Sequence, residues 1–221
     1  MIAAGASQAQ IYVGDTKAAK VYLGSTLIWE PPVLGVAYSD SLDSLSGFTQ
    51  TNTGSGVVSN NGEAAWTGSS DGGSRVIYNQ AALTDNQYVS AVLGPNITAR
   101  SGVLIFHCND AATGWYGVSW SSGSAIVLGR GSGNWTGSFD STIQSVSTGS
   151  PGTDGTVELW NIGDNFKVAV NGTVVINTTV ANSIRGSNYR RQGFGMYRSA
   201  FLSTGRIETW FGGDAAAYSK T

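Results

Sequence analysis

The chain of 221 residues has a single cysteine, Cys108, and a single histidine, His107. One cysteine excludes a disulfide within the chain, and the pair falls short of the about four ligands of a structural zinc site. Adjacent residues of a strand point to opposite faces, so this pair cannot act together as base and nucleophile. We therefore expect His107 to be a hydrogen-bonded strand residue and Cys108 a small buried apolar one.

Charge is also scarce. Charged residues make up 12% of the chain, against about 25% in typical soluble domains. The net charge is −2, and Arg190–Arg191 is the one basic doublet. This composition lacks the basic surface that nucleic-acid binding requires, so we expect no nucleic-acid partner. We also expect no membrane span, because no segment approaches the about 20 apolar residues of a spanning helix. Residues 1–10 show no signal-peptide pattern.

Acidic residues are too dispersed for catalysis by paired carboxylates. A retaining glycoside hydrolase holds two carboxyl groups about 5–5.5 Å apart. Glu158 and Glu208 are each the one acid of their expected strands, and most aspartates lie in turn-like contexts. We therefore predict no catalytic residues and a protein that is not an enzyme.

Glycine is abundant, at 31 residues, and short β-rich runs follow one another with turn signals between them. The run 103–106 is apolar without alternation, which predicts a central strand covered on both faces. Asn171-Gly172 between two β-rich runs predicts a tight hairpin. Other expected strands lie at 115–120 and 156–162, which alternate, and at 166–170, 173–176 and 206–211. The pattern predicts an all-β fold, an antiparallel β-sandwich of jelly-roll type over residues 36–214, with a tail at 215–221.

Residues 10–29 contain an internal repeat with a spacing of ten, since Ile11–Thr16 recurs as Val21–Thr26. Each copy predicts a strand, a Gly-X turn and a second strand. In the second hairpin we expect these pairs: Leu23 with Thr26, Tyr22 with Leu27, and Val21 with Ile28.

This hairpin module, residues 1–30, is smaller than the about 40 residues at which a domain usually stands alone. We expect it to attach the protein to another protein or to a second copy, or else to be a simple extension of the sandwich. Pro31-Pro32 predicts a linker over residues 31–35.

Three polar and aromatic clusters between expected strands are candidates for glycan binding. Flat rings stack on sugar faces, whereas Asn, Asp and Arg hydrogen-bond hydroxyl groups; the alternative is that the rings serve packing. The clusters are Asn109, Asp110, Trp115 and Tyr116; Arg130, Asn134 and Trp135; and Tyr189, Arg190 and Arg191.

Two resemblances follow from these motifs. Ile11–Gly14 with Lys20–Trp29 resembles the N-terminal module of minor tail proteins from tailed phages of actinobacteria, in which a doubled VYVG-x-T motif often precedes a variable domain. Three later segments resemble the concanavalin-A-like, laminin-G-like jelly roll: Thr156–Trp160, Val168–Gly172, and Arg206–Phe211 with Gly213-Asp214. Asp43–Phe48 resembles the opening strand of that fold.

The resemblances imply a phage virion structural protein, a minor tail or tail-tip component. Residues 10–29 would bind other virion proteins, as a homo-oligomer, and the lectin-like domain would face a host cell-wall glycan. A capsid decoration protein and a stand-alone carbohydrate-binding domain are the alternatives. Glycoside hydrolases share this jelly roll, but their Glu-x-Asp-x-x-Glu pattern is absent here. The chain has no Asp-x-Asp run, so we expect no metal ligands and no cofactor. The alternative is a calcium site, because laminin-G-like domains often bind Ca²⁺.

Overall fold

The computed structural model describes residues 12–13, 16–17, 21–23, 25–29, 35–95, 102–120, 125–200 and 205–220. The chain divides into two compact units, Met1–Leu34 and Gly35–Thr221. The predicted linker lies outside the described residues except for Gly35.

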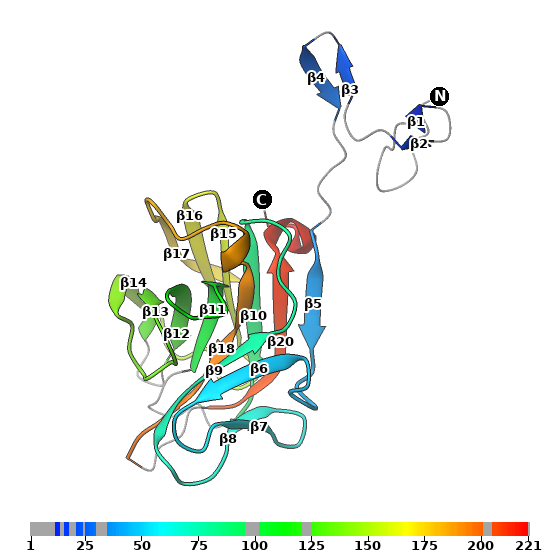
Figure 1. The fold of residues 1–221 in the computed structure, drawn as a ribbon. Coiled ribbons are helices and arrows are strands. Elements are labelled where there is room, and N and C mark those ends of the chain that lie inside the picture. Colours follow the sequence, from blue (N-terminus) through cyan, green and yellow to red (C-terminus); the bar gives the residue numbers. More distant parts are fainter. Residues whose placement is uncertain are drawn as a thin grey trace. The chain divides into compact units, whose positions relative to one another are not determined.

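Two short antiparallel hairpins make up the described part of the first unit (Figure 1). β1 (Tyr12–Val13) pairs with β2 (Thr16–Lys17), and β3 (Val21–Leu23) pairs with β4 (Thr26–Trp29). The hairpins repeat at the spacing of ten that the sequence shows.

The register of the second hairpin follows the prediction at its turn and departs from it at its open end. Leu23 faces Thr26, and Tyr22 faces Leu27, as expected. The pairing of Val21 with Ile28 was wrong, because Val21 faces Trp29. The register shifts between Val21 and Tyr22, as an extra residue in one strand of a pair would cause.

The second unit is a sandwich of two antiparallel eight-stranded sheets, which confirms the predicted all-β jelly roll. One sheet, the β10 sheet, has in spatial order β17 (Thr173–Thr179), β16 (Asn165–Val170), β15 (Thr156–Ile162), β10 (Gln87–Leu93), β20 (Ile207–Asp214), β8 (Ala64–Trp66) and β7 (Val57–Ser59), and β5 (Ala37–Asp40) also pairs with β20. The other, the β11 sheet, has β14 (Ser141–Ser147), β13 (Ala125–Gly131), β12 (Trp115–Trp120), β11 (Gly102–Cys108), β18 (Arg191–Gly195), β9 (Gly72–Tyr78) and β19 (Tyr197–Arg198), and β6 (Phe48–Asn52) also pairs with β9.

Apolar side chains from both sheets fill the space between them. Leu104 and Phe106 of β11 are fully buried there, together with Val89 of β10. Phe48 bridges the layers, because its ring centroid lies 5.6 Å from Phe194 of β18 and 5.3 Å from Trp210 of β20. Burial of apolar surface of this kind is the main force that holds two sheets together.

A second apolar cluster covers the outer face of the β11 sheet. It contains Val103 and Ile105 of β11 together with Trp115 of β12. Trp135 and Phe139, from the segment between β13 and β14, lie over them. All of β11 and β12 is therefore buried. This confirms the covered central strand at 103–106, whereas the alternation at 115–120 does not mark an exposed face.

The hairpin of β16 and β17 turns at Asn171-Gly172, as predicted, with φ of 49° and 77°. Two positive φ values define the type I′ turn, which matches the twist of the flanking strands. The Asn171 side chain accepts a hydrogen bond from the Thr156 amide at 2.8 Å. The turn is therefore tied to the neighbouring strand β15.

The opening strand expected at Asp43–Phe48 is not observed. The first strand of this unit is β5, and β6 begins only at Phe48. Asp40 Oδ1 accepts a hydrogen bond from the Leu42 amide at 2.8 Å, and Leu42 has φ of 59°. An aspartate that bonds the amide two residues on forms an Asx turn. A second turn follows within the expected strand, because the Phe48 amide donates to the Leu45 carbonyl at 3.0 Å.

The described helical elements are two 3₁₀ turns, η1 (Ser187–Tyr189) and η2 (Ala215–Tyr218). The second lies in the predicted tail. Within the described ranges, no helix has both the length and the apolar character needed to cross a membrane.

Candidate functional site

A polar cleft lies where the loop after β11 meets β18 and the end of β9. It consists of two adjoining depressions of about 260 and 380 Å³ that share Asn109, Asp110 and Arg191. We call it the arginine cleft. Its lining residues are Thr49, Arg75, Ile77, Tyr78, Asn79, Ala81, Asn109, Asp110, Ala111, Ser187, Asn188 and Arg191.

The loop after β11 forms one wall of the cleft, and Asn109 holds its shape. The Asn109 amide group donates to the Thr113 hydroxyl at 2.8 Å, and its oxygen accepts from the Thr113 amide at 3.0 Å. The backbone carbonyl of Asn109 accepts from the Ala112 amide at 3.0 Å. The Asn109 side chain therefore stabilises the loop, whereas the Asp110 side chain is 83% exposed.

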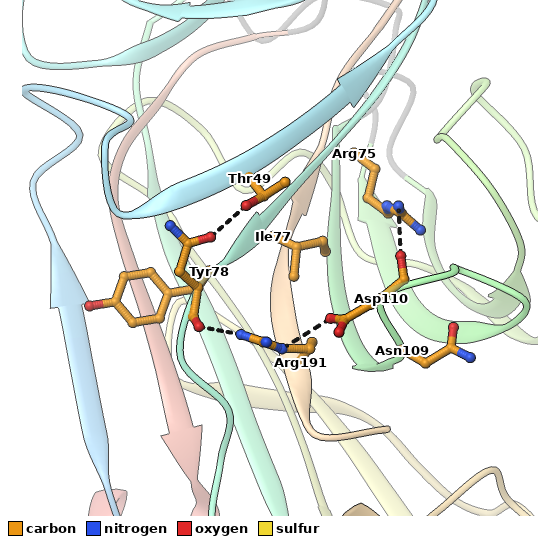
Figure 2. A pocket seen from close by; sticks show the side chains of 8 residues that line it. Thr49, Arg75, Ile77, Tyr78, Asn109, Asp110 and Arg191 are labelled. Carbon is orange, nitrogen blue, oxygen red and sulfur yellow. Dashed lines mark hydrogen bonds and ion pairs between the residues drawn. The ribbon is translucent and has the colours of Figure 1, made fainter. Parts of the chain in front are cut away.

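Arg191 connects the walls of the cleft (Figure 2). Its Nε lies 3.2 Å from Oδ1 of Asp110, and its Nη1 donates to the backbone carbonyl of Asn79. Asn79 in turn accepts a hydrogen bond from the Thr49 hydroxyl at 2.6 Å. The ring of Tyr78 points away from these groups, so the described lining presents no aromatic face beside Arg191.

Arg75 enters the cleft from β9, where it faces Thr51 of β6 in register. It is only 9% exposed. Its Nη2 lies 3.4 Å from the backbone carbonyl of Asp110, a long contact, and its buried Nε and Nη1 have no hydrogen-bond partner. Burial of a charged group without partners is costly. Arg75 is therefore an incompletely satisfied cation in the wall of the cleft.

Three predicted binding residues are packing residues. Trp115 and Trp135 are each 1% exposed, and their ring centroids lie 6.3 Å apart over the outer face of the β11 sheet. Tyr116 is 4% exposed, with its ring 5.2 Å from Phe166 in the core. The expectation that these rings stack on a sugar is therefore corrected, because a neighbouring side chain already covers each of them.

The other predicted residues do not gather into one site. Asn134 lies beside the cleft, and its side-chain oxygen accepts from the Thr51 hydroxyl at 3.0 Å. Arg130 is exposed on β13. Arg190 is bound by Asp85, 2.8 Å away, and the backbone carbonyl of Tyr189 accepts a hydrogen bond from Gln87 at 2.9 Å.

Of the three sequence clusters, only Asn109 and Asp110 of the first and Arg191 of the third meet in the cleft. Sequence reasoning missed Arg75. The sequence does contain a signal for it, because an arginine inside a β-rich run is unusual in a chain with so few charged residues.

His107 and Cys108 have the roles expected for them. Both are fully buried. His107 Nδ1 lies 3.1 Å from the Gln87 amide nitrogen, and its Nε2 lies 3.1 Å from the Asn161 oxygen. Burial lowers the pKa of His107 to about 4 and raises the pKa of the Cys108 thiol to about 11. Neither group is ionised near neutral pH, and a protonated thiol is a weak nucleophile.

A calcium site requires six to eight oxygen ligands, several of them carboxylates. Among the described residues, no group of three or more His, Cys, Asp or Glu side chains could hold a metal ion. Several carboxylates have cationic partners instead: Asp71 with Arg198, Asp164 with Arg185, Glu63 with Arg206, and Glu158 with Lys220. Cationic side chains of the domain itself therefore neutralise these four carboxylates.

A second depression, of about 400 Å³, lies on the β10 sheet and includes Tyr88, Glu158, Phe211 and Tyr218. The Tyr88 ring stacks on Tyr218, with centroids 4.2 Å apart. Glu158 accepts a hydrogen bond from the Tyr88 hydroxyl at 2.7 Å and lies 2.9 Å from Lys220 Nζ. The Tyr88 hydroxyl and the Glu158 carboxylate of this depression therefore already have partners, whereas Nε and Nη1 of Arg75 in the arginine cleft have none.

Fold and site define a jelly-roll domain with a solvent-open polar cleft. No family model matches the chain, and no curated protein matches it. Solved structures with the same fold include the VIP36 exoplasmic/lumenal domain in its metal-free form, with a TM-score of 0.58 and 8% identity over 80% of this chain and 91% of that one. The Ca²⁺/Man3GlcNAc-bound form of that domain has a TM-score of 0.54 and 8% identity over 75% and 83%.

The carbohydrate recognition domain of Emp46p, in its potassium-bound form, has a TM-score of 0.55 and 13% identity over 79% of this chain and 91% of that one. At such identities the likeness establishes the fold, and a fold by itself does not define an activity.

Proposed function

We propose that residues 35–221 form a non-enzymatic carbohydrate-binding domain and that the arginine cleft holds the glycan. The observation that carries the proposal is the convergence of Asp110, Ser187, Asn188 and Arg191 on one solvent-open cleft. Each sugar hydroxyl donates one hydrogen bond and accepts others, so mixed carboxylate, amide, hydroxyl and guanidinium groups suit it. The jelly roll that this chain shares with the Man3GlcNAc-bound VIP36 domain and the Emp46p carbohydrate recognition domain supports the proposal.

The test is a glycan array, followed by calorimetry and amide NMR with the glycans that bind. Ala111→Trp places a large ring in the cleft from an exposed loop position. We expect it to weaken binding of any glycan at least about tenfold, a loss of about 1.4 kcal/mol. Ala216→Trp, at an exposed position of η2, is the matched control and should bind normally.

The proposal fails if the array yields no glycan, or if Ala111→Trp binds as tightly as the parent protein. Glu158→Gln separates binding from hydrolysis. A parent protein that degrades a polysaccharide, and a variant that does not, would mean that the domain is an enzyme after all.

We further propose that the first unit attaches this domain to a larger assembly, as a homo-oligomer on a phage tail tip or capsid. The repeated hairpins and two exposed apolar side chains support this, since Leu23 is 74% and Ile28 57% exposed. Exposed apolar side chains that lie close together are typical of interaction surfaces. Electron microscopy of antibody-labelled particles tests the assignment, and intact virions without label would contradict it.

A further inference from the structure

We propose that the arginine cleft selects acidic glycans, in which a carboxylate, sulfate or phosphate group binds between Arg75 and Arg191. This inference rests on the proposed function and gives it a substrate class. The three acid groups share the chemistry that matters here, since each presents two or more oxygens to a guanidinium fork.

The first reason is the charge of the cleft. Its twelve lining residues include two arginines and one acid, Asp110. Arg190, which directly precedes Arg191 in the chain, does not line the cleft and is paired with Asp85. The lining therefore carries one positive charge that no lining carboxylate balances, and a partly enclosed cleft concentrates the field of that charge.

The second reason is the state of Arg75. A guanidinium has five N–H donors. In Arg75, Nη2 approaches the Asp110 carbonyl at 3.4 Å, and the guanidinium also interacts with the Cys108 thiol. Nε and Nη1 are buried and unpartnered. A guanidinium binds an oxoanion through two adjacent nitrogens, so an oxoanion with one oxygen on Nη2 would satisfy one of these two donors with its other oxygen. Charge-assisted hydrogen bonds are stronger in surroundings with little water.

The third reason is that an oxoanion already rests on the other arginine. The Asp110 carboxylate lies 3.2 Å from Arg191 Nε and is itself 83% exposed. Exposed ion pairs contribute little stability, so a ligand acid can replace this one. The Asp110 carboxylate thus occupies the place beside Arg191 that the acid group of a ligand would take.

The experiment compares mannose oligosaccharides that carry a 6-phosphate, a 6-sulfate or no acid group, together with oligogalacturonate and its neutral galactose counterpart, by calorimetry. We expect at least one acidic ligand to bind about tenfold tighter than its neutral counterpart, with the advantage shrinking at high salt. The pattern among the three acids identifies which oxoanion the cleft accepts.

Arg75→Met removes the charge and keeps the length of the side chain. It should abolish the acidic preference, measured as the ratio of acidic to neutral affinity, with the thermal midpoint unchanged or raised because an unsatisfied charge is gone. Arg206→Met, which removes an arginine paired with Glu63 outside the cleft, should keep the preference. Asp110→Asn should increase the affinity for acidic ligands, because the competing carboxylate is lost.

Neutral and acidic glycans of equal affinity would overturn the inference and leave the proposed function standing. Inorganic phosphate or sulfate that binds as tightly as the acidic glycan would overturn it too, because the cleft would then select an ion and no sugar. If no glycan of either kind binds, the proposed function itself fails.

Discussion

His107 shows how a single side chain connects the two layers of the sandwich. It belongs to β11, whereas its partners Gln87 and Asn161 belong to strands of the β10 sheet. The Asn161 oxygen can only accept, so His107 Nε2 carries the proton and Nδ1 accepts from the Gln87 amide group. Gln192 joins the same network by donating to the Gln87 oxygen at 3.0 Å. A second proton on His107 would place two donors face to face.

This arrangement makes stability depend on pH. The folded pKa of His107 is lowered to about 4 by burial, below its unfolded value of about 6.5. The unfolded state therefore binds more protons between these two pH values, and stability falls as the pH drops through that range. We expect a loss of about 2 kcal/mol at about pH 5 relative to neutral pH, measured by urea unfolding.

His107→Asn is the matched variant for this prediction. Position 107 has φ of 48°, a left-handed conformation that asparagine tolerates better than most residues. The variant keeps hydrogen-bonding capacity without a group that titrates in this range, so its stability should change less between the two conditions. An equal pH dependence in both proteins would rule out His107 as the source.

Asp214 is a second residue that several segments depend on. This fully buried carboxylate accepts hydrogen bonds from the amides of Val36 at 2.8 Å, Leu83 at 3.1 Å and Thr84 at 2.7 Å. It thereby joins the first residues of the sandwich to the end of its last strand. The Gly213-Asp214 motif was noted in the sequence as a family resemblance, and these bonds supply its physical role.

At the scale of elements, the outer face of the β11 sheet depends on glycines that leave room for rings. A Cβ at Gly131 would lie 2.4 Å from ring atoms of Trp115. A Cβ at Gly73 would lie 1.9 Å from the backbone oxygen of Trp135. The segment that carries Trp135 can therefore lie flat on β9 and close the cluster over β11.

Gly131→Ala tests this arrangement. The added methyl group should displace the Trp115 ring and destabilise the domain by about 1–3 kcal/mol, the usual cost of overpacking. Chemical unfolding followed by tryptophan fluorescence measures it. Ser145→Ala, an exposed position of β14, is the control and should change little. Unaltered stability of the glycine variant would mean that the ring has free space to move into.

At the scale of the whole molecule, we propose separate roles for the two units. The sandwich contains its own inter-sheet core and the complete arginine cleft, and it begins at Gly35. A domain with its own core can fold alone. The first unit contributes the repeated hairpins.

We therefore expect residues 35–221, expressed alone, to keep the thermal midpoint and the glycan affinity of the full chain. The shortened chain should lose self-association, because Leu23 and Ile28 are removed. Analytical ultracentrifugation of the full chain, the shortened chain and a Leu23→Ser, Ile28→Ser variant makes the comparison. A shortened chain that unfolds at a lower temperature would show that the units stabilise each other.

The sequence by itself determined the local structure. Alternation and apolar runs predicted β11, β12, β15, β16, β17 and β20 of the sandwich. Asn171-Gly172 predicted a type of turn that few other pairs adopt, and the repeat at residues 10–29 predicted two hairpins. These features are readable because backbone conformation depends on near neighbours. The opening strand that the resemblance implies at Asp43–Phe48 is wrong, because the chain turns there, with the Phe48 amide bonded to the Leu45 carbonyl.

Only the tertiary structure decided which side chains are available for function. Trp115 and Trp135 look like sugar platforms in the sequence, but in the structure their rings pack together and are buried over the outer face of the β11 sheet. Arg75, Asp110 and Arg191 converge because β11, β18 and β9 are neighbours in one sheet, an order that no local pattern records. Exposure and convergence are properties of segments far apart in the chain, so they exist only once the sheets have packed.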